Sequence, residues 1–328
     1  MARCGTTNFN DASDYQASIR GAKFNIAFNS QRAFEARLTW VELRHLRLLH
    51  GQENLPRVAH ISLPLDSVFI ALPTINDPPL IYGGVEVLSG DIVLHSLGGH
   101  MHQRTRGPSQ WSFIALAPEH FAAWGRTLTG FYLAPPSVTR ILRPSRLDSA
   151  HLSRLHADAC RLVETNPEII AHQQVARAIE QDILPVLVNC LMSKDAHKYN
   201  ASNRNHADII ARFEDIIAIH PERYLQISDL CEAVGVPERT LRTCCTEFLG
   251  MGPNRYLRLR RLNMVHAELR RNVSPTASVE EVARRYGFSE LGRFAALYQT
   301  VFGEMPSTTL RCARTAPTRK SSLVSETG

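Results

Sequence analysis

Short apolar runs separated by turn signals dominate the first part of the chain. Their Val, Ile and Leu content and their length of four to six residues are typical of buried strands. The runs are Ser67–Leu72, Val85–Leu88, Asp91–Leu94 and Trp111–Leu116. Gly83-Gly84 and Ser89-Gly90 lie between successive runs and favour tight turns. This pattern predicts a compact β-barrel or sandwich over residues 37–147, preceded by an N-terminal segment, residues 1–36.

The periodicity changes to that of helices after the apolar runs. Leu152, Leu155, Ala159 and Leu162 recur at spacings of three or four residues. Asn166-Pro167 then predicts a break before a second helix that runs to about Met192. We therefore expect a helical region over residues 148–195.

Residues 196–206 are polar, rich in Asn and without apolar periodicity, which predicts a linker. Helical patterns then resume, so we expect a second domain over residues 207–312. The remaining residues, 313–328, contain Ser, Thr and Pro with little to bury, and are expected to be disordered.

The second domain contains an internal repeat. Leu230–Val236 aligns with Val282–Phe288 at an offset of 52 residues, and Leu241 to Pro253 continues the match onto Phe294 to Pro306 at an offset of 53. Agreement on both sides of one inserted residue indicates two copies of one supersecondary unit.

Each copy is predicted to form two short helices joined by a glycine turn. Gly235 and Gly287 supply turns with positive φ, and Pro237 suits the first residue of a helix. Ser228, Ser278 and Ser289 are predicted to cap helices, because Ser oxygens accept hydrogen bonds from the first free N–H groups. Helix, glycine turn, helix is the helix-turn-helix arrangement, although two helical hairpins in a structural bundle would give the same pattern.

A long basic helix is expected between the two copies. Residues from Pro253 to about Arg271 predict a rod of roughly 28 Å at 1.5 Å per residue. Major-groove faces on one side of B-DNA recur about every 34 Å, so such a rod suits adjacent grooves. Its arginines suit phosphate contacts, and a solvated helix face is the alternative. These arginines are Arg255, Arg258, Arg260, Arg261, Arg270 and Arg271.

Residues 208–311 resemble the DNA-binding domain of the AraC/XylS transcription regulators. The motifs that carry the resemblance are Ile227-Ser228-Asp229-Leu230, Gly235-Val236-Pro237, Phe248–Pro253 with Tyr256-Leu257, Val282–Phe288 and Phe302–Pro306. The resemblance implies a first helix-turn-helix unit at about 228–249 and a second at about 279–302. The expected fold is thus α+β and multidomain, with an all-α C-terminal domain.

The resemblance also implies which side chains meet DNA. The first recognition helix would run from Pro237 to Phe248, with Leu241, Cys244, Cys245 and Phe248 facing the core. The side chains expected to read bases are Arg239, Arg242, Thr243 and Arg293, since Arg gives bidentate hydrogen bonds to guanine. Those expected at the DNA backbone are Arg255, Arg258, Arg261 and Ser289. The second recognition helix departs from the family pattern, because it carries Leu291, Gly292, Ala295 and Ala296.

Residues 37–147 resemble, less specifically, the cupin-like regulatory domains of this family. That resemblance implies a β-barrel that binds a small-molecule effector, and a dimerisation role for the helices of residues 148–195, which could instead cover the barrel as a lid. An N-terminal domain that serves only assembly is the alternative. The resemblance further implies a transcriptional activator that acts as a homodimer on double-stranded promoter DNA and contacts RNA polymerase.

Composition narrows the remaining choices. The 328 residues have a net charge of +6, which permits a nucleic-acid partner without requiring one. No stretch is long enough to span a membrane and the N-terminus lacks a signal-like apolar core, so we expect a cytoplasmic protein without a membrane partner. The seven cysteines show no CxxC spacing, which gives no indication of a zinc cluster or a disulfide framework.

The histidines offer the one competing chemistry. His95, His100 and His102 lie close in sequence, and a metal-dependent cupin enzyme would use such a His-x-His pair with a nearby carboxylate. Residues 103–106 supply no carboxylate, so we expect neither a catalytic metal nor a cofactor, and no enzyme. Cys244 and Cys245 are expected in the core rather than as nucleophiles.

Overall fold

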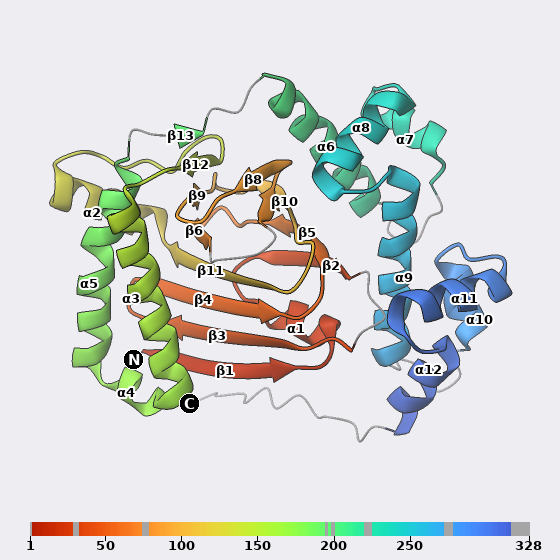
Figure 1. Ribbon diagram of the computed structural model, residues 1–328, viewed down its shortest axis with the longest axis horizontal. Helices are drawn as coiled ribbons and strands as arrows, with labels where there is room; N and C mark the ends of the chain where they lie inside the picture. The colour runs from red at the N-terminus through yellow and green to blue at the C-terminus, as the bar shows by residue number, and fades with distance from the viewer. Residues whose placement is uncertain are drawn as a thin grey trace.

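The structure, a computed structural model, describes residues 2–28, 33–73, 79–193, 196–197, 201–219, 225–271 and 278–315. Antiparallel sheets occupy the N-terminal part, and helices cover one side of them and form the C-terminal part (Figure 1). The chain therefore has the mixed α and β composition predicted, with sheets first and helices last. No helix of the described residues has the length and apolar character needed to cross a membrane.

Two antiparallel sheets form the N-terminal part. The larger has the order β1-β3-β4-β11-β6-β9-β12-β13 and the smaller the order β2-β5-β10-β7-β8. The strands of the larger sheet are β1 (Arg3–Phe9), β3 (Ala36–Glu42), β4 (Leu46–Glu53), β11 (Ser109–Leu116), β6 (Val68–Pro73), β9 (Ile92–Leu94), β12 (Arg140–Leu142) and β13 (Ala196–His197). Those of the smaller sheet are β2 (Lys23–Phe28), β5 (Arg57–Ser62), β10 (His100–Arg104), β7 (Leu80–Tyr82) and β8 (Val85–Val87).

The sheets face each other across an apolar core. Phe24 and Ile61 of the smaller sheet pack there with Leu49, Phe69 and Phe113 of the larger. No ladder of backbone hydrogen bonds joins the two sheets within the described residues, so the arrangement there is a two-sheet sandwich, one of the two forms that the apolar runs predict. The N-terminal segment, residues 1–36, contributes β1 to the larger sheet and β2 to the smaller one.

The central strands of the larger sheet are buried on both faces. On β11, Phe113 faces the inter-sheet core, whereas Ile114 and Leu116 face a second core beneath helices. Those helices are α2 (Pro118–Thr129), α3 (Arg146–Thr165), α4 (Pro167–Ala171) and α5 (Gln173–Leu191), and α3 and α5 lie along the sheet in Figure 1. Burial of both faces explains why these strands are continuous apolar runs rather than alternating ones. The helix break predicted at Asn166-Pro167 is present.

Seven helices follow the sheets in the part of the chain that the structure describes. They are α6 (Ala201–Ile219), α7 (Ile227–Val234), α8 (Glu238–Leu249), α9 (Pro253–Arg271), α10 (Val279–Arg285), α11 (Leu291–Phe302) and α12 (Pro306–Thr315). Both ends of the expected linker, residues 196–206, have regular structure, because Ala196 pairs with Leu142 and α6 begins at Ala201. Of the expected tail, residues 313–315 belong to α12, and residues 316–328 lie outside the described part of the chain.

Three details of the predicted helix starts are wrong. Gln226 and Glu290, with extended backbones, occupy the N-cap positions of α7 and α11, and neither Ser228 nor Ser289 caps its helix through its side chain. Pro237 is the N-cap of α8 rather than its first helical residue. The capping residue is the one with extended backbone, which sequence fixes only to within a residue or two. Ser278 does cap α10, where its Oγ accepts from the Glu281 N–H at 3.0 Å.

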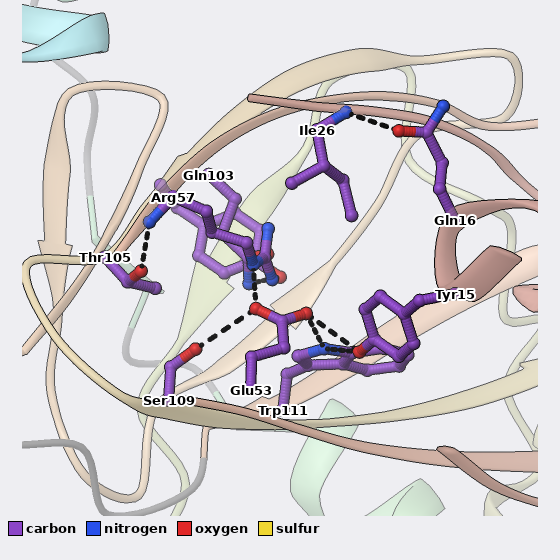
Figure 2. Close-up of polar contacts among 10 residues, drawn as sticks. Tyr15, Gln16, Ile26, Glu53, Arg57, Gln103, Thr105, Ser109 and Trp111 are labelled. Carbon is purple, nitrogen blue, oxygen red and sulfur yellow. Dashed lines mark hydrogen bonds and ion pairs between the residues drawn. The ribbon is translucent and has the colours of Figure 1, made fainter. Parts of the chain in front are cut away.

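A buried polar network lies between the sheets, centred on Glu53 of β4 (Figure 2). Tyr15 Oη and Trp111 Nε1 donate to Glu53 Oε1 at 2.8 and 2.9 Å. Arg57 pairs with Glu53 Oε2 and also donates to Gln103 Oε1. Burial, followed by the Glu53 charge, raises the pKa of Tyr15 well above its usual value. The network keeps an ion pair between β4 and β5 inside the sandwich, with hydrogen-bond partners from β10, β11 and the helix of Tyr15.

Candidate nucleic-acid interface

The first helix-turn-helix unit consists of α7 and α8. Gly235 ends α7 with φ at 76°, the left-handed conformation predicted for this turn. On α8, Leu241, Cys244, Cys245 and Phe248 are at most 3% exposed, as their spacing predicts. Burial raises the pKa of the Cys244 thiol to about 11, so it is protonated near neutral pH. The cysteines therefore hold α8 in its core rather than offering a reactive thiolate.

The opposite face of α8 is exposed and carries Arg239, Arg242 and Thr243. Arg242 Nη2 lies 2.6 Å from Glu238 Oε1, one turn earlier, with both side chains more than half exposed. Such surface pairs contribute little free energy, so DNA can compete for this guanidinium. Thr243 Oγ1 donates to the Arg239 carbonyl oxygen at 3.0 Å and keeps its acceptor capacity. These three side chains stay predicted base readers.

The second unit, α10 and α11, is similar in backbone but different in its exposed side chains. Gly287 has φ at 80°, and Phe294, Tyr298 and Val301 form the buried face of α11. Arg293 is exposed and pairs with Glu290 at 3.0 Å. The first two turns of this helix otherwise expose Gly292 and Ala296, which have no side-chain hydrogen-bonding groups.

Helix α9 joins the two units, and its arginines differ in exposure. Arg255 and Arg258 are exposed, as a phosphate-contacting role requires. Arg261 is half-buried, with its guanidinium carbon 5.5 Å from the centre of the Phe288 ring, so it supports the second unit. Ser289, in the turn before α11, is exposed. Contact of these four side chains with the DNA backbone stays a prediction.

The sheets contact α9 near its C-terminal end. Arg270 Nε lies 2.6 Å from Asp11 Oδ2, and Asn263 Nδ2 donates to the Phe28 carbonyl oxygen at 3.5 Å. Asp11 is 5% exposed and also caps α1 (Ala12–Ser18) by accepting from two backbone N–H groups. Arg270 is one of the arginines of the long basic helix predicted from the sequence. In the structure its side chain pairs with Asp11 of the N-terminal part.

A second contact lies near the other end of α9 and is centred on Glu214 of α6. Glu214 accepts from Tyr256 Oη at 2.6 Å and pairs with Arg260 of α9. On the sheet side, His102 Nε2 lies 2.9 Å from Glu214 Oε1, and His60 Nδ1 lies 3.7 Å from Oε2. Burial alone would raise the pKa of Glu214, but the hydrogen bond with His102 and the charge of Arg260 lower it well below its usual value. Glu214 is thus a buried carboxylate that joins the two parts of the chain.

The three histidines singled out from the sequence do not come together. His95 lies inside the sandwich beside Tyr82 and Phe113, and burial lowers its pKa to about 3. His100 is exposed and bonds Ser62 Oγ at 3.0 Å. Only His102 joins a group with metal-ligand atoms, whose other members within the described residues are His60 and Glu214. Sequence reasoning missed Glu214 because it lies 112 positions from His102.

Comparisons with known proteins agree with this helix arrangement. A family model described as a helix-turn-helix domain matches residues 230–311. The chain is 35% identical over 114 residues to the XylDLEGF operon transcriptional activator 2 of Pseudomonas putida, covering 34% of this chain and 73% of that protein. It is 34% identical over 97 residues to a probable thc operon regulatory protein of Rhodococcus erythropolis, covering 30% of this chain and 29% of that one. The match to the XylDLEGF operon transcriptional activator of P. putida covers 30% of this chain and 32% of that protein.

Two solved structures extend the comparison. A probable AraC family transcriptional regulator from Rhodopseudomonas palustris CGA009 is 30% identical and covers 32% of this chain and 97% of its own, with a TM-score of 0.31. The AraC-like transcriptional activator CuxR is 15% identical and covers 81% of this chain and 96% of its own, with a TM-score of 0.41.

Proposed function

This chain belongs to the AraC/XylS family of transcription regulators, and from that premise we propose that it activates transcription by binding promoter DNA through residues 207–312. The observation that carries the proposal is the pair of helix-turn-helix units on one continuous helix, α9, with exposed arginines on α8 and α9. Arg239 and Arg242 read guanines, whereas Arg255 and Arg258 contact phosphates and fix the position of the protein. Catalysis has no part in this proposal.

The C-terminal helices alone are expected to fold and bind DNA. Among the described residues, their two apolar cores take only Val58 and Ala27, respectively, from the N-terminal part, so almost all of this apolar packing lies within the helices. A fragment of residues 201–315, the bounds of α6 and α12, should retain the helical circular dichroism of a folded domain and bind sites selected by the full chain in a mobility-shift assay. The same fragment with Arg239→Ala and Arg242→Ala is the control. A folded fragment that binds none of those sites would contradict the proposal.

The domain boundaries and the cupin-like character of residues 37–147 belong to the same proposal, as does control by a small-molecule effector. Unsatisfied polar groups inside the sandwich support it. Arg57 Nη1 and both ring nitrogens of His95 are buried and have no hydrogen-bond partner among the described residues. Buried polar atoms are nearly always hydrogen-bonded in native proteins, so these atoms suit a bound polar ligand. We further propose a homodimer formed through α3 to α5, and a contact with RNA polymerase, as the family implies.

A ligand that binds only the folded chain should raise its thermal midpoint. We expect a small polar metabolite from the producing cell to raise the midpoint of the full chain and to change the output of a reporter promoter. His95→Leu should remove both responses, whereas His151→Leu, a change at an exposed position of α3, should leave them intact. A library of metabolites that changes neither quantity would favour the alternative in which the N-terminal part serves only assembly.

A further inference from the structure

Three side chains with metal-ligand atoms meet where the smaller sheet contacts α6. His60 of β5 and His102 of β10 are directly paired in the antiparallel ladder, so both rings lie on the same face of that sheet. Their rings stack with centroids 4.9 Å apart. Helix α6 brings Glu214 onto this face, and the potential ligand atoms of the three residues all lie within 4.8 Å of one another.

We propose that His60, His102 and Glu214 bind one divalent transition-metal ion of the zinc class across the junction between the sheets and the DNA-binding helices. Ligand atoms about 2.1 Å from a tetrahedral zinc ion lie roughly 3.4 Å apart. The distances from the Glu214 oxygens, 2.9 Å from Oε1 to His102 and 3.7 Å from Oε2 to His60, bracket that value. Two imidazoles and one carboxylate form a ligand set that zinc uses when it keeps a fourth position for water.

The surroundings orient the carboxylate for this role. Tyr256 donates to Oε1 at 2.6 Å and Arg260 holds Oε2, so α9 anchors both oxygens, with Oε1 nearer His102 and Oε2 nearer His60. Such outer contacts set the orientation of metal ligands. Side-chain exposure is 12% at His60, compared with 4% at His102 and 1% at Glu214, so the His60 side is where water and the ion reach the site.

Binding changes the proton and charge balance in a defined way. The ion replaces the hydrogen bond between His102 Nε2 and Glu214 Oε1, so a proton on that nitrogen is released to solvent or moves to Nδ1. The nearby guanidinium of Arg260 repels the cation. We therefore expect weaker binding than at a closed site of four anionic or neutral ligands, and an affinity that increases with pH where that proton is released to solvent.

This site differs from the His-x-His site considered from sequence. His95 is inside the sandwich, and His100 is exposed and bonded to Ser62, whereas the carboxylate comes from a helix of the other part of the chain. A metal bound here would tie α6 to the smaller sheet. The proposal therefore goes beyond DNA binding and does not depend on it.

The test uses the full chain after chelator treatment, titrated with Zn²⁺ by calorimetry and with Co²⁺ by visible absorption. We expect one ion per chain, tetrahedral-type Co²⁺ absorption bands and a thermal midpoint that rises with added metal. His60→Ala and His102→Ala should each weaken binding by at least roughly tenfold. His100→Ala is the matched control, since His100 lies two residues from His102 on the same strand face, and it should bind as the wild type does.

Thermal midpoints without metal show which variants fold. His60→Ala is the milder change because its side chain is the most exposed of the three, so it decides the question if His102→Ala does not fold. Absence of stoichiometric metal from the wild type, undiminished binding in His60→Ala, or an equal loss in His100→Ala would each overturn the proposal.

Discussion

Arg57→Met is expected to lower the free energy of unfolding of the sheet domain by about 3–5 kcal/mol. The substitution removes the cation that pairs with Glu53 and leaves that carboxylate buried, with both side chains at most 1% exposed. Tyr15 and Trp111 still donate to Glu53, but neutral donors do not replace the lost charge. Urea unfolding followed by tryptophan fluorescence measures the effect, because Trp40, Trp111 and Trp124 all lie in the N-terminal part.

An exposed ion pair on the same sheets provides the control. Arg3 and Glu42 pair at 3.1 Å with the Arg3 side chain 65% exposed, so Arg3→Met should cost no more than about 1 kcal/mol. If Arg57→Met and Arg3→Met had equal effects, the Glu53 network would not stabilise the sandwich in the way described.

Arg239→Ala is expected to weaken binding to the selected DNA site by about 1–3 kcal/mol and to relax preference at one base position. At about 1.4 kcal/mol per factor of ten, this is a loss of roughly 5- to 150-fold. The reason is the loss of a bidentate contact from the exposed face of α8. Quantitative mobility shifts and selection from randomised sites measure the two effects.

The matched control is Arg258→Ala on α9. Its exposed guanidinium is predicted to contact phosphate, so the change should weaken binding to all sequences alike and reduce the salt dependence. The half-site under α11 should also be less sharply specified than that under α8, because in the first two turns of α11 Arg293 is the only exposed side chain with hydrogen-bonding groups. Equal sharpness of the two half-sites, without a DNA-deformability difference, would contradict this assignment.

Local signals account for what the sequence predicted well. Gly235 and Gly287 mark turns through a backbone conformation that other residues adopt at a cost, and the spacing of Leu241, Cys244 and Phe248 defines one helix face. These features depend only on residues close together in sequence, so the helices and turns of both helix-turn-helix units could be predicted from the sequence. The base-reading and phosphate-contacting roles of their arginines stay predictions.

Pairing over long distances was beyond sequence reasoning. Strand β11 is apolar on both faces, so its pattern carried no alternation from which to assign partners or faces. The network of Glu53 and Arg57 joins strands whose order along the chain does not predict their neighbours. Glu214 reaches His102 only because α6 packs on the smaller sheet. Side-chain clusters formed by residues that are far apart in sequence can be identified only once the fold is known.

The continuity of α9 has a consequence for how target promoters can change. Both helix-turn-helix units pack on this one helix, which has no internal break between Pro253 and Arg271 (Figure 1). The two contacts are expected about one turn, roughly 10 base pairs, apart. A promoter that gains or loses a single base pair between them rotates one contact by about a tenth of a turn relative to the other. Selection should therefore remove insertions and deletions between the two contact sites as strongly as it removes base substitutions within them. Searches of a genome for target sites should keep the number of base pairs between the two contact sites constant.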